Sequence, residues 1–190
     1  SAMIRLPTRE SDGKANLHQG AMGIGIDITT GISCAGVHHD KTVDNHPDTG
    51  YSIKEIVIPH WQKILHTAVQ CADTVGLGYL GVDIVMDREL GPLMLELNAR
   101  PGLNVQLANQ MGLLNKLRKV EAIESLPKSV AERIALAVNY RSKLNPRHLI
   151  IKGGVGLILK AYRFSWIYSF ISRVDLNRHT LFKSTVISAS

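Results

Sequence analysis

Two short apolar segments joined by a polar turn constrain the fold of this chain more than any other feature. Residues 80–86 and 93–97 each have the length and composition of a strand, and residues 87–91 form a tight connection between them. A connection this short predicts an antiparallel hairpin. With its turn centred in that connection, the hairpin places Asp83 roughly opposite Glu96, with β-carbons about 5 Å apart.

The two faces of this predicted hairpin differ in chemistry, because successive side chains of a strand point to opposite faces. The three leucines of residues 93–97 fall on one face, which we expect to pack into a core backed by a helix that carries Trp61. Asp83, Glu96 and Asn98 fall on the other face. Two adjacent carboxylates repel each other unless they share a proton or a cation, and together with an amide oxygen they suit a hard divalent ion. On spacing alone, an ordinary solvated surface explains these charges equally well.

The residues that follow the second strand add positive charge and a rigid turn. Arg100, Pro101 and Gly102 come directly after Asn98. They would bring a guanidinium and backbone amides near any phosphate held by the metal, and residues 103–111 are predicted to form a short helix whose N-terminus lies close behind. This context favours a site for a metal ion and phosphate over a solvated surface.

Further elements are predicted on both sides of the hairpin. Apolar residues recur at three- and four-residue steps over residues 59–75, which indicates an amphipathic helix. The alternation of isoleucine with polar residues and glycine within residues 16–38 predicts a β-hairpin that turns at residues 30–31. Ser129 and Glu132 have the spacing of a capping box, so a helix is expected to begin there and to run to about residue 138.

A polar segment rich in histidine covers residues 38–50 and has the composition of an exposed loop. His38, His39, Asp40 and His46 could ligate a metal, but they do not follow any recognised zinc-binding spacing. We therefore interpret the segment as a loop.

Composition places the chain among globular proteins with one sizeable core, since 45% of its 190 residues are hydrophobic. It has neither an export signal nor a run of about 20 apolar residues, so we expect a cytoplasmic protein. Cys34 and Cys71 lack the spacing of a metal site or redox motif and are expected to be buried free thiols. Residues 1–2 resemble the remnant of a cleaved tag and are set aside, so that the predicted domain covers residues 3–140.

The formal charge of +6 is concentrated at one end of the chain. Residues 1–140 carry 13 basic and 15 acidic residues, whereas residues 141–190 carry 9 basic residues and only Asp175. This segment lacks a clear period and is interpreted as a basic tail. It could be disordered, contact a membrane surface or nucleic acid, or be a non-native continuation of the reading frame; we favour the first and the last, and do not expect nucleic acid or anionic membrane as a partner.

Two motifs that follow each other in the expected order along the chain give a specific resemblance to a known family. The segments GVDIV at residues 81–85 and LELNARPGL at residues 95–103 resemble the metal-binding strand pair of ATP-grasp ligases. Upstream, KANLHQG at residues 14–20 is similar to the nucleotide-contacting segment of the alpha-L-glutamate ligase branch. Lys14 and Gln19 stand where that branch usually has arginine, and a lysine does not reproduce the bidentate contact of an arginine.

The resemblance implies a set of roles for individual residues. Asp83, Glu96 and Asn98 would bind the Mg²⁺ or Mn²⁺ ions that bridge the phosphates of ATP. Arg5, Lys14, Asn16 and Asn98 would contact the nucleotide, and Arg100 would act in catalysis. It further implies that ATP activates a carboxylate as an acylphosphate and that an amine then displaces the phosphate to form an amide.

The fold implied by the resemblance is α+β: the C-terminal subdomain of an ATP-grasp enzyme, with an antiparallel sheet and packed helices. We expect an incomplete fold whose partner is an N-terminal subdomain of the same enzyme, since the adenine pocket of this family lies mainly upstream, and we expect this part alone to be inactive. The carboxylate and amine substrates are not identified. The alternative is a catalytically inactive binding module of ATP-grasp origin whose basic tail contacts nucleic acid or membrane.

Overall fold

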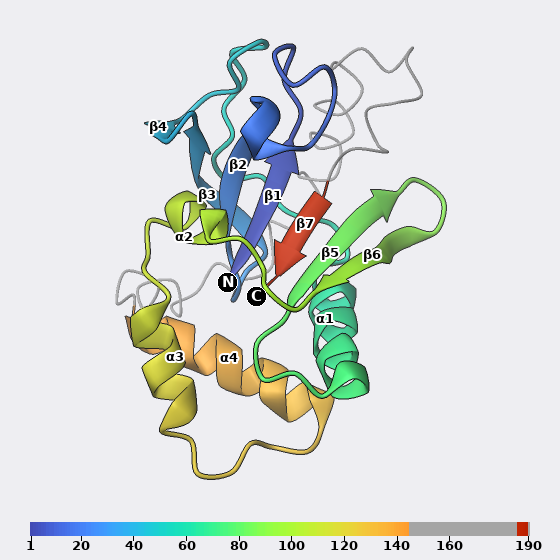
Figure 1. Ribbon diagram of the computed structural model, residues 1–190, viewed down its shortest axis with the longest axis vertical. Coiled ribbons are helices and arrows are strands. Elements are labelled where there is room, and N and C mark those ends of the chain that lie inside the picture. The colour runs from blue at the N-terminus through green and yellow to red at the C-terminus, as the bar shows by residue number, and fades with distance from the viewer. Residues whose placement is uncertain (145–185, 190) are drawn as a thin grey trace, which may run out of the picture.

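A computed structural model of the protein describes residues 1–144 and 186–189 and contains a seven-stranded sheet (Figure 1). The strands lie in the order β4 (Lys41–Val43), β3 (Ile32–His38), β2 (Met22–Asp27), β1 (Ala2–Leu6), β7 (Val186–Ala189), β5 (Gly81–Asp87) and β6 (Gly91–Asn98). Every neighbouring pair is antiparallel. With helices packed on this sheet, the predicted α+β class is confirmed.

The described residues also contain five helices. They are the 3₁₀ helix η1 (Leu17–Gln19), and the α-helices α1 (Trp61–Val75), α2 (Asn104–Ala108), α3 (Leu114–Glu121) and α4 (Val130–Leu144). The predicted capping box of α4 is present, because the Ser129 hydroxyl donates to Glu132 at 2.7 Å and accepts from its backbone N–H at 3.2 Å. None of the helices in this part of the chain is long and apolar enough to span a membrane.

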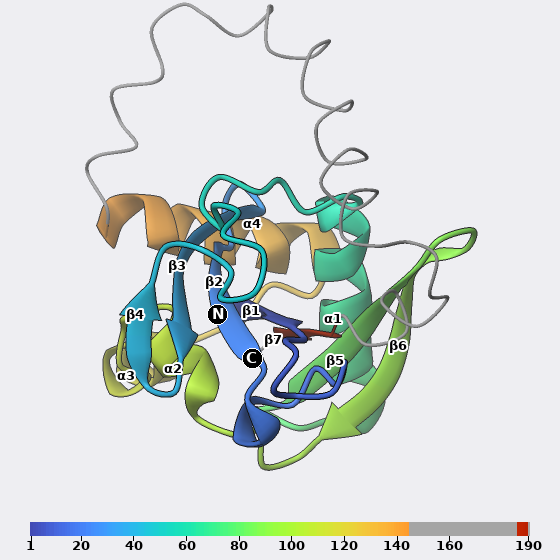
Figure 2. The same ribbon diagram turned by 90° about the horizontal axis from the view of Figure 1, so that it is seen from above.

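Alternate residues of β1 contribute to different layers of the core. Ala2 is fully buried in the cluster that contains Trp61 and Ile64 of α1, whereas Met3 packs with Val105 and Ala108 of α2. The helices α1 and α2 therefore cover opposite faces of the sheet, and Figure 2 shows α1 beside β5 and β6. Arg5, two residues after Met3, belongs to the α2 face because of the same alternation.

The predicted helix over residues 59–75 corresponds to α1, and Trp61 anchors its first turn to the β2–β3 connection. The indole Nε1–H donates to the carbonyl of Ile28 at 3.0 Å. Gly31 turns the chain with φ +70° directly against this ring, where a β-carbon would lie 2.5 Å from Cγ of Trp61. The helix ends at Gly76, whose left-handed conformation is favoured by glycine.

The expectation that the leucines of residues 93–97 all point into the core is wrong. Leu93 and Leu95 are 38% and 60% exposed, and only Leu97 packs against the α1 cluster. A β-bulge explains the difference, because Asp83 pairs with Glu96 but the next residue, Ile84, pairs with Met94. The bulge leaves Leu95 without a cross-strand partner and shifts the alternation of faces along β6.

Other element boundaries also differ from those expected. The helix predicted over residues 103–111 is limited to α2, and α3 was not predicted. The short strand β4 lies inside the predicted loop of residues 38–50, where it pairs with the end of β3. Ala2, which the sequence analysis set aside, is part of β1.

The proposed boundary between domain and tail falls inside α4, which continues to Leu144. Most of the predicted tail, residues 145–185 and 190, lies outside the described residues, so its interpretation as a basic tail stays a prediction. Its last part, β7, pairs with both β1 and β5.

Candidate functional site

A hollow of about 160 Å³ lies on the α2 side of the sheet and brings together distant parts of the chain. Its walls come from β1, the η1 segment, β5, the end of β6 and the loop that leads into α2. The residues that line it are Met3, Arg5, Asn16, Leu17, His18, Gly81, Asp83, Asn98, Pro101, Gly102, Asn104 and Val105. Four of the predicted site residues, from three separate segments, are thus neighbours of one cavity.

The predicted cross-strand pairing of the acidic residues is confirmed. Asp83 of β5 lies opposite Glu96 of β6, and Gly81 lies opposite Asn98. Because residues two apart on a strand share a face, Asp83, Glu96 and Asn98 lie on the same face of the hairpin. The β-bulge begins just beyond Asp83 and leaves this arrangement intact.

The β5–β6 turn holds the strands in this register. The carboxylate of Asp87 accepts hydrogen bonds from the backbone N–H groups of Leu90 and Glu89, both at 2.8 Å. These bonds, that of Leu90 foremost, hold the pKa of Asp87 below its ordinary value. The ionised carboxylate thereby stabilises the tight turn that sets Asp83 opposite Glu96.

Arg5 places a cation beside these carboxylates. Its guanidinium donates to Oδ2 of Asp83 at 2.7 Å, and both side chains are 21% exposed. The ion pair reduces the repulsion between Asp83 and Glu96. Within the described residues, Nε of Arg5 is buried and has no hydrogen-bond acceptor. The guanidinium therefore has donor capacity in excess of its single contact with Asp83.

The loop after β6 begins at Asn98, one of the predicted site residues. Oδ1 of Asn98 accepts the backbone N–H of Arg100 at 3.0 Å, which turns the chain out of the sheet. Pro101 then packs over Gly81, where a β-carbon would lie 2.6 Å from the proline ring. The side chain of Arg100 is exposed and does not belong to the wall of the hollow.

The η1 segment supplies the wall opposite the hairpin. The side chain of Asn16 accepts the backbone N–H of His18 at 3.0 Å and so caps η1. Both residues line the hollow, whereas Lys14 is exposed and does not. His18 was missed by the sequence analysis, although it stands inside the segment that carries the family resemblance.

The chemistry of the donor set fits a hard divalent cation. Asp83, Glu96 and Asn98 offer only oxygen atoms, the ligands that Mg²⁺ and Mn²⁺ prefer, and the hairpin places them on one face. Asp83 and Asn98 line the hollow, whereas Glu96 is exposed beside it and is not part of its wall. Arg5 and the amide of Asn16, which suit phosphate oxygens, also line the hollow.

Comparison with known proteins gives one finding. The model of a family described as sugar-transfer associated ATP-grasp matches residues 1–122, which is more than half of the chain. The matched range includes every residue that lines the hollow. No curated protein and no solved structure matches the chain.

Proposed function

The chain belongs to the sugar-transfer associated ATP-grasp family, and we propose that the hollow is where it binds the phosphates of ATP together with Mg²⁺. Membership of this family indicates an ATP-dependent, ligase-like function. The observation that carries the proposal is the convergence of Arg5, Asn16, Asp83 and Asn98 on one cavity, although these residues come from segments far apart in the chain.

In this proposal, the carboxylates of Asp83 and Glu96 and the amide oxygen of Asn98 hold Mg²⁺ or Mn²⁺. When bound, the ion neutralises phosphate oxygens and so favours transfer of the γ-phosphoryl group. Arg5 replaces part of that positive charge while no metal is present, since it already pairs with Asp83 at 2.7 Å. With a metal on the carboxylates, the guanidinium of Arg5 would be available to a phosphate oxygen.

Two further residues have positioning roles. Asn16 would donate its amide N–H to phosphate, because its side-chain oxygen is already engaged with the backbone of His18. The backbone of Arg100 fixes the orientation of Asn98, and its exposed side chain would contact the reacting phosphoryl group from outside the hollow. Lys14 is exposed in the same segment as Asn16 and would add positive charge near the nucleotide.

We further propose carbon–nitrogen ligation of the alpha-L-glutamate ligase type, supported by the segments at residues 14–20, 81–85 and 95–103. A substrate carboxylate oxygen would attack the γ-phosphorus of ATP and release ADP, which gives an acylphosphate. An amine would then add to the acyl carbon and expel phosphate, which gives the amide. Cations in the site stabilise the charge on the phosphoryl oxygens, so that a side-chain nucleophile is not required.

Titration of the chain with ATP in the presence and absence of Mg²⁺ tests the site. Glu96→Gln is the informative variant, because Asp83 also holds Arg5 and its loss would disturb two interactions. Glu89→Gln, an exposed change of the same kind in the β5–β6 turn, is the matched control. We expect Glu96→Gln to weaken the Mg²⁺-dependent binding by about 10-fold or more and Glu89→Gln to leave it unchanged. Equal affinity of the two variants would contradict the metal-site assignment.

A further inference from the structure

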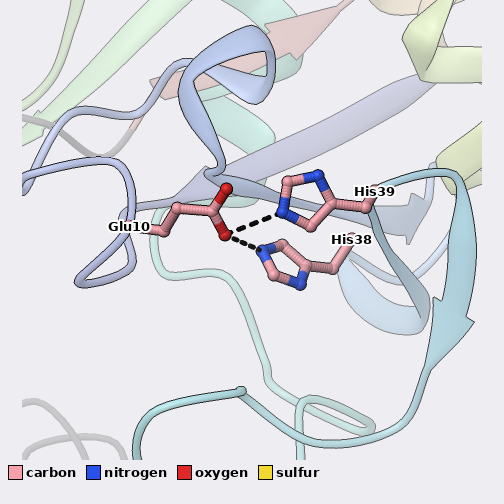
Figure 3. A group of neighbouring side chains, drawn as sticks. All are labelled: Glu10, His38 and His39. Atoms are coloured by element: carbon pink, nitrogen blue, oxygen red, sulfur yellow. Dashed lines mark hydrogen bonds and ion pairs between the residues drawn. The ribbon is translucent and has the colours of Figure 1, made fainter.

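A second group of potential metal ligands lies at the end of β3, outside the hollow (Figure 3). His38 is the last residue of β3 and His39 begins the turn to β4, while Glu10 comes from the segment between β1 and η1. One ligand atom from each of these three residues lies within 4.8 Å of the other two. The chain thus joins two adjacent histidines with a carboxylate that is distant in sequence.

The distances within this group are close to those of a coordination shell. Oε2 of Glu10 lies 2.7 Å from Nε2 of His39 and 3.8 Å from Nε2 of His38, and the two imidazole rings have their centroids 4.3 Å apart. Ligand atoms about 2.0–2.2 Å from a tetrahedral Zn²⁺ lie about 3.4 Å from one another. Only small side-chain movements therefore separate this arrangement from one that surrounds an ion.

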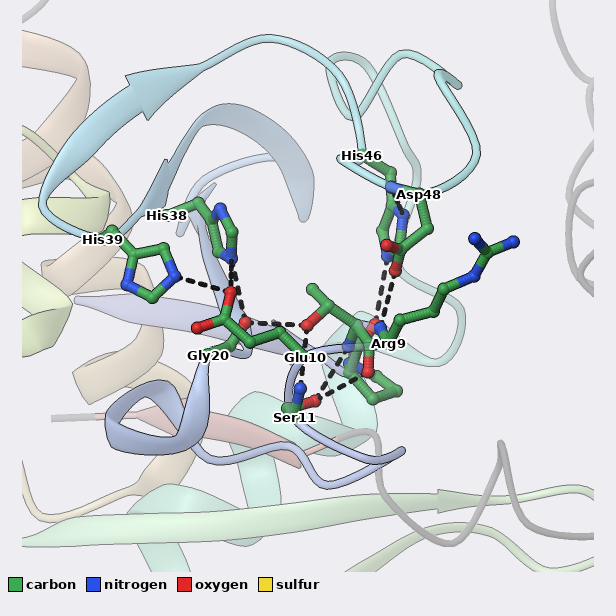
Figure 4. Close-up of polar contacts among 10 residues, drawn as sticks. Arg9, Glu10, Ser11, Gly20, His38, His39, His46 and Asp48 are labelled. Carbon is green, nitrogen blue, oxygen red and sulfur yellow. Dashed lines mark hydrogen bonds and ion pairs between the residues drawn. The ribbon is translucent and has the colours of Figure 1, made fainter.

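The backbone beneath the carboxylate is shaped to hold Glu10 in place. Gly20 has φ +93°, and a β-carbon on it would lie 2.7 Å from Cδ of Glu10. Its carbonyl accepts hydrogen bonds from the hydroxyl of Thr8 at 2.8 Å and from Nε2 of His38 at 2.9 Å (Figure 4). Thr8 and Ser11 are buried and bonded to each other on either side of Glu10.

The hydrogen bond to Gly20 also defines the tautomer of His38. A carbonyl oxygen can only accept, so Nε2 of His38 carries the hydrogen in this arrangement. Coordination of a metal through Nε2 of His38 would require the other neutral tautomer, with its hydrogen on Nδ1 and a lone pair on Nε2. Thr8 would still satisfy the carbonyl of Gly20 after that change.

The other candidates of the histidine-rich segment do not join the group. Nε2 of His46 lies 3.0 Å from the carbonyl of Pro7, and its Nδ1 accepts the backbone N–H of Asp48 at 3.3 Å. Asp40 is exposed and is not part of the cluster. Glu10, which no sequence pattern singled out, is the third member of the group instead.

We propose that Glu10, His38 and His39 form a binding site for a divalent transition metal of the Zn²⁺ class. Two imidazoles and one carboxylate favour such an ion over Mg²⁺, which prefers oxygen ligands alone. His38 is 17% exposed at its side chain, whereas Glu10 and His39 are more than half exposed, so water can complete the coordination. The ion would fasten the segment of residues 7–21 to the β3–β4 hairpin, and it is separate from the proposed Mg²⁺ site in the hollow.

Titration of the full chain with Zn²⁺ tests this site. Cys34 is exposed rather than buried as expected, so a Cys34→Ser background removes a thiol that could bind the metal elsewhere. We expect saturable binding of one Zn²⁺ that is weakened about 10-fold or more by Glu10→Gln and by His39→Asn. His66→Asn, at an exposed position of α1, should leave it unchanged. Glu10 and His39 are surface residues, so we expect their variants to fold, and circular dichroism of each variant verifies this.

Limited digestion with trypsin gives a second readout, because Arg9 and Lys14 lie in the fastened segment. Zn²⁺ should slow cleavage after these residues in the parent chain and in His66→Asn, but not in His39→Asn. Any effect of Zn²⁺ on trypsin itself is the same for the two variants, so a difference between them reports on the metal site. The proposal is overturned if Glu10→Gln and His39→Asn bind Zn²⁺ as tightly as the parent chain, or if His66→Asn weakens binding to the same extent.

Discussion

Among single residues, Arg5 determines how two carboxylates can face each other in the absence of a metal. Its guanidinium holds Asp83, which lies opposite Glu96 on the neighbouring strand. We expect Arg5→Met, which keeps most of the side-chain volume, to lower the free energy of unfolding by about 1–3 kcal/mol through loss of the charge-assisted hydrogen bond to Asp83. Mg²⁺ should restore part of this loss, because it can take the place of the guanidinium.

Urea unfolding with and without Mg²⁺ measures both effects. Arg9→Met is the matched control, since the side chain of Arg9 is exposed. If Mg²⁺ stabilises wild type and Arg5→Met equally, the carboxylates do not respond to the loss of their cation, and the electrostatic account of the pair is wrong.

Two glycines with nearly the same positive φ allow the cost of backbone strain to be separated from the cost of overpacking. Gly31 and Gly50 have φ +70° and +69°, but a β-carbon at Gly31 would meet the Trp61 ring at 2.5 Å, whereas Gly50 has nothing within 4 Å. Gly50→Ala should cost only the backbone strain, about 1 kcal/mol. Gly31→Ala should cost about 2–4 kcal/mol, because it adds overpacking against the indole. Equal losses in thermal or urea unfolding would mean that the ring moves aside freely.

At the scale of elements, the β5–β6 hairpin shows what alternation can and cannot predict. The pairing of Asp83 with Glu96 follows from segment length and turn position, and both were readable in the sequence. The bulge at Leu95 could not be read from the sequence, because no residue type marks its position. It arises where β6 forms an edge of the sheet. A leucine on the expected core face is therefore 60% exposed.

The exposure of Leu95 changes the expected effect of truncating its side chain, compared with that of a buried residue on the neighbouring strand. Leu95→Ala should lower the free energy of unfolding by less than about 1 kcal/mol, because its side chain is mostly solvated. Ile84→Ala removes a fully buried side chain from the α1 cluster and should cost about 2–5 kcal/mol. Chemical denaturation of the two variants compares them directly, and similar losses would show that Leu95 is buried in solution.

The contact between α1 and α4 predicts a dependence of stability on pH. Arg133 of α4 forms a two-pronged ion pair with Asp73 of α1, and its hydrogen bonds hold the pKa of Asp73 below the ordinary value of 3.8. Because the pKa is lower in the folded state, the stabilisation is fully present above about pH 4 and is lost as pH falls through the folded-state value. The free-energy difference between wild type and Asp73→Asn should shrink over that range.

Unfolding curves recorded at several pH values, with Arg133→Gln and the double variant completing a thermodynamic cycle, isolate the pair. A coupling that persists unchanged at pH values well below the ordinary pKa would show that the carboxylate does not need its charge, contrary to the ion-pair account.

At the scale of the whole molecule, the parts of the two candidate sites differ in how far the sequence could predict them. Asp83, Glu96 and Asn98 are local to one hairpin, so their shared face follows from strand geometry. The Arg5–Asp83 pair joins residues 78 positions apart, and Glu10 meets His39 over 29 positions. Such contacts depend on the order of strands in the sheet, which alternation and spacing within one segment do not encode.

The strand β7 supplies the last prediction, because it is the backbone link between the two parts of the sheet. Val186–Ala189 pairs with β1 on one side and β5 on the other, so that the strand carrying Arg5 and the strand carrying Asp83 are joined through it. The sequence-based interpretation of residues 141–190 as a tail predicts that a chain ending at residue 185 folds as before. From the pairing of β7, we expect the opposite: a loss of several kcal/mol, at about 1 kcal/mol for each backbone hydrogen bond removed. Exposure of the β1 and β5 edges should also promote association between chains. Urea unfolding and light scattering of the chain ending at 185, compared with one that lacks only Ser190, decide between the two expectations: unchanged stability and a monomeric state would show that β7 has no structural role.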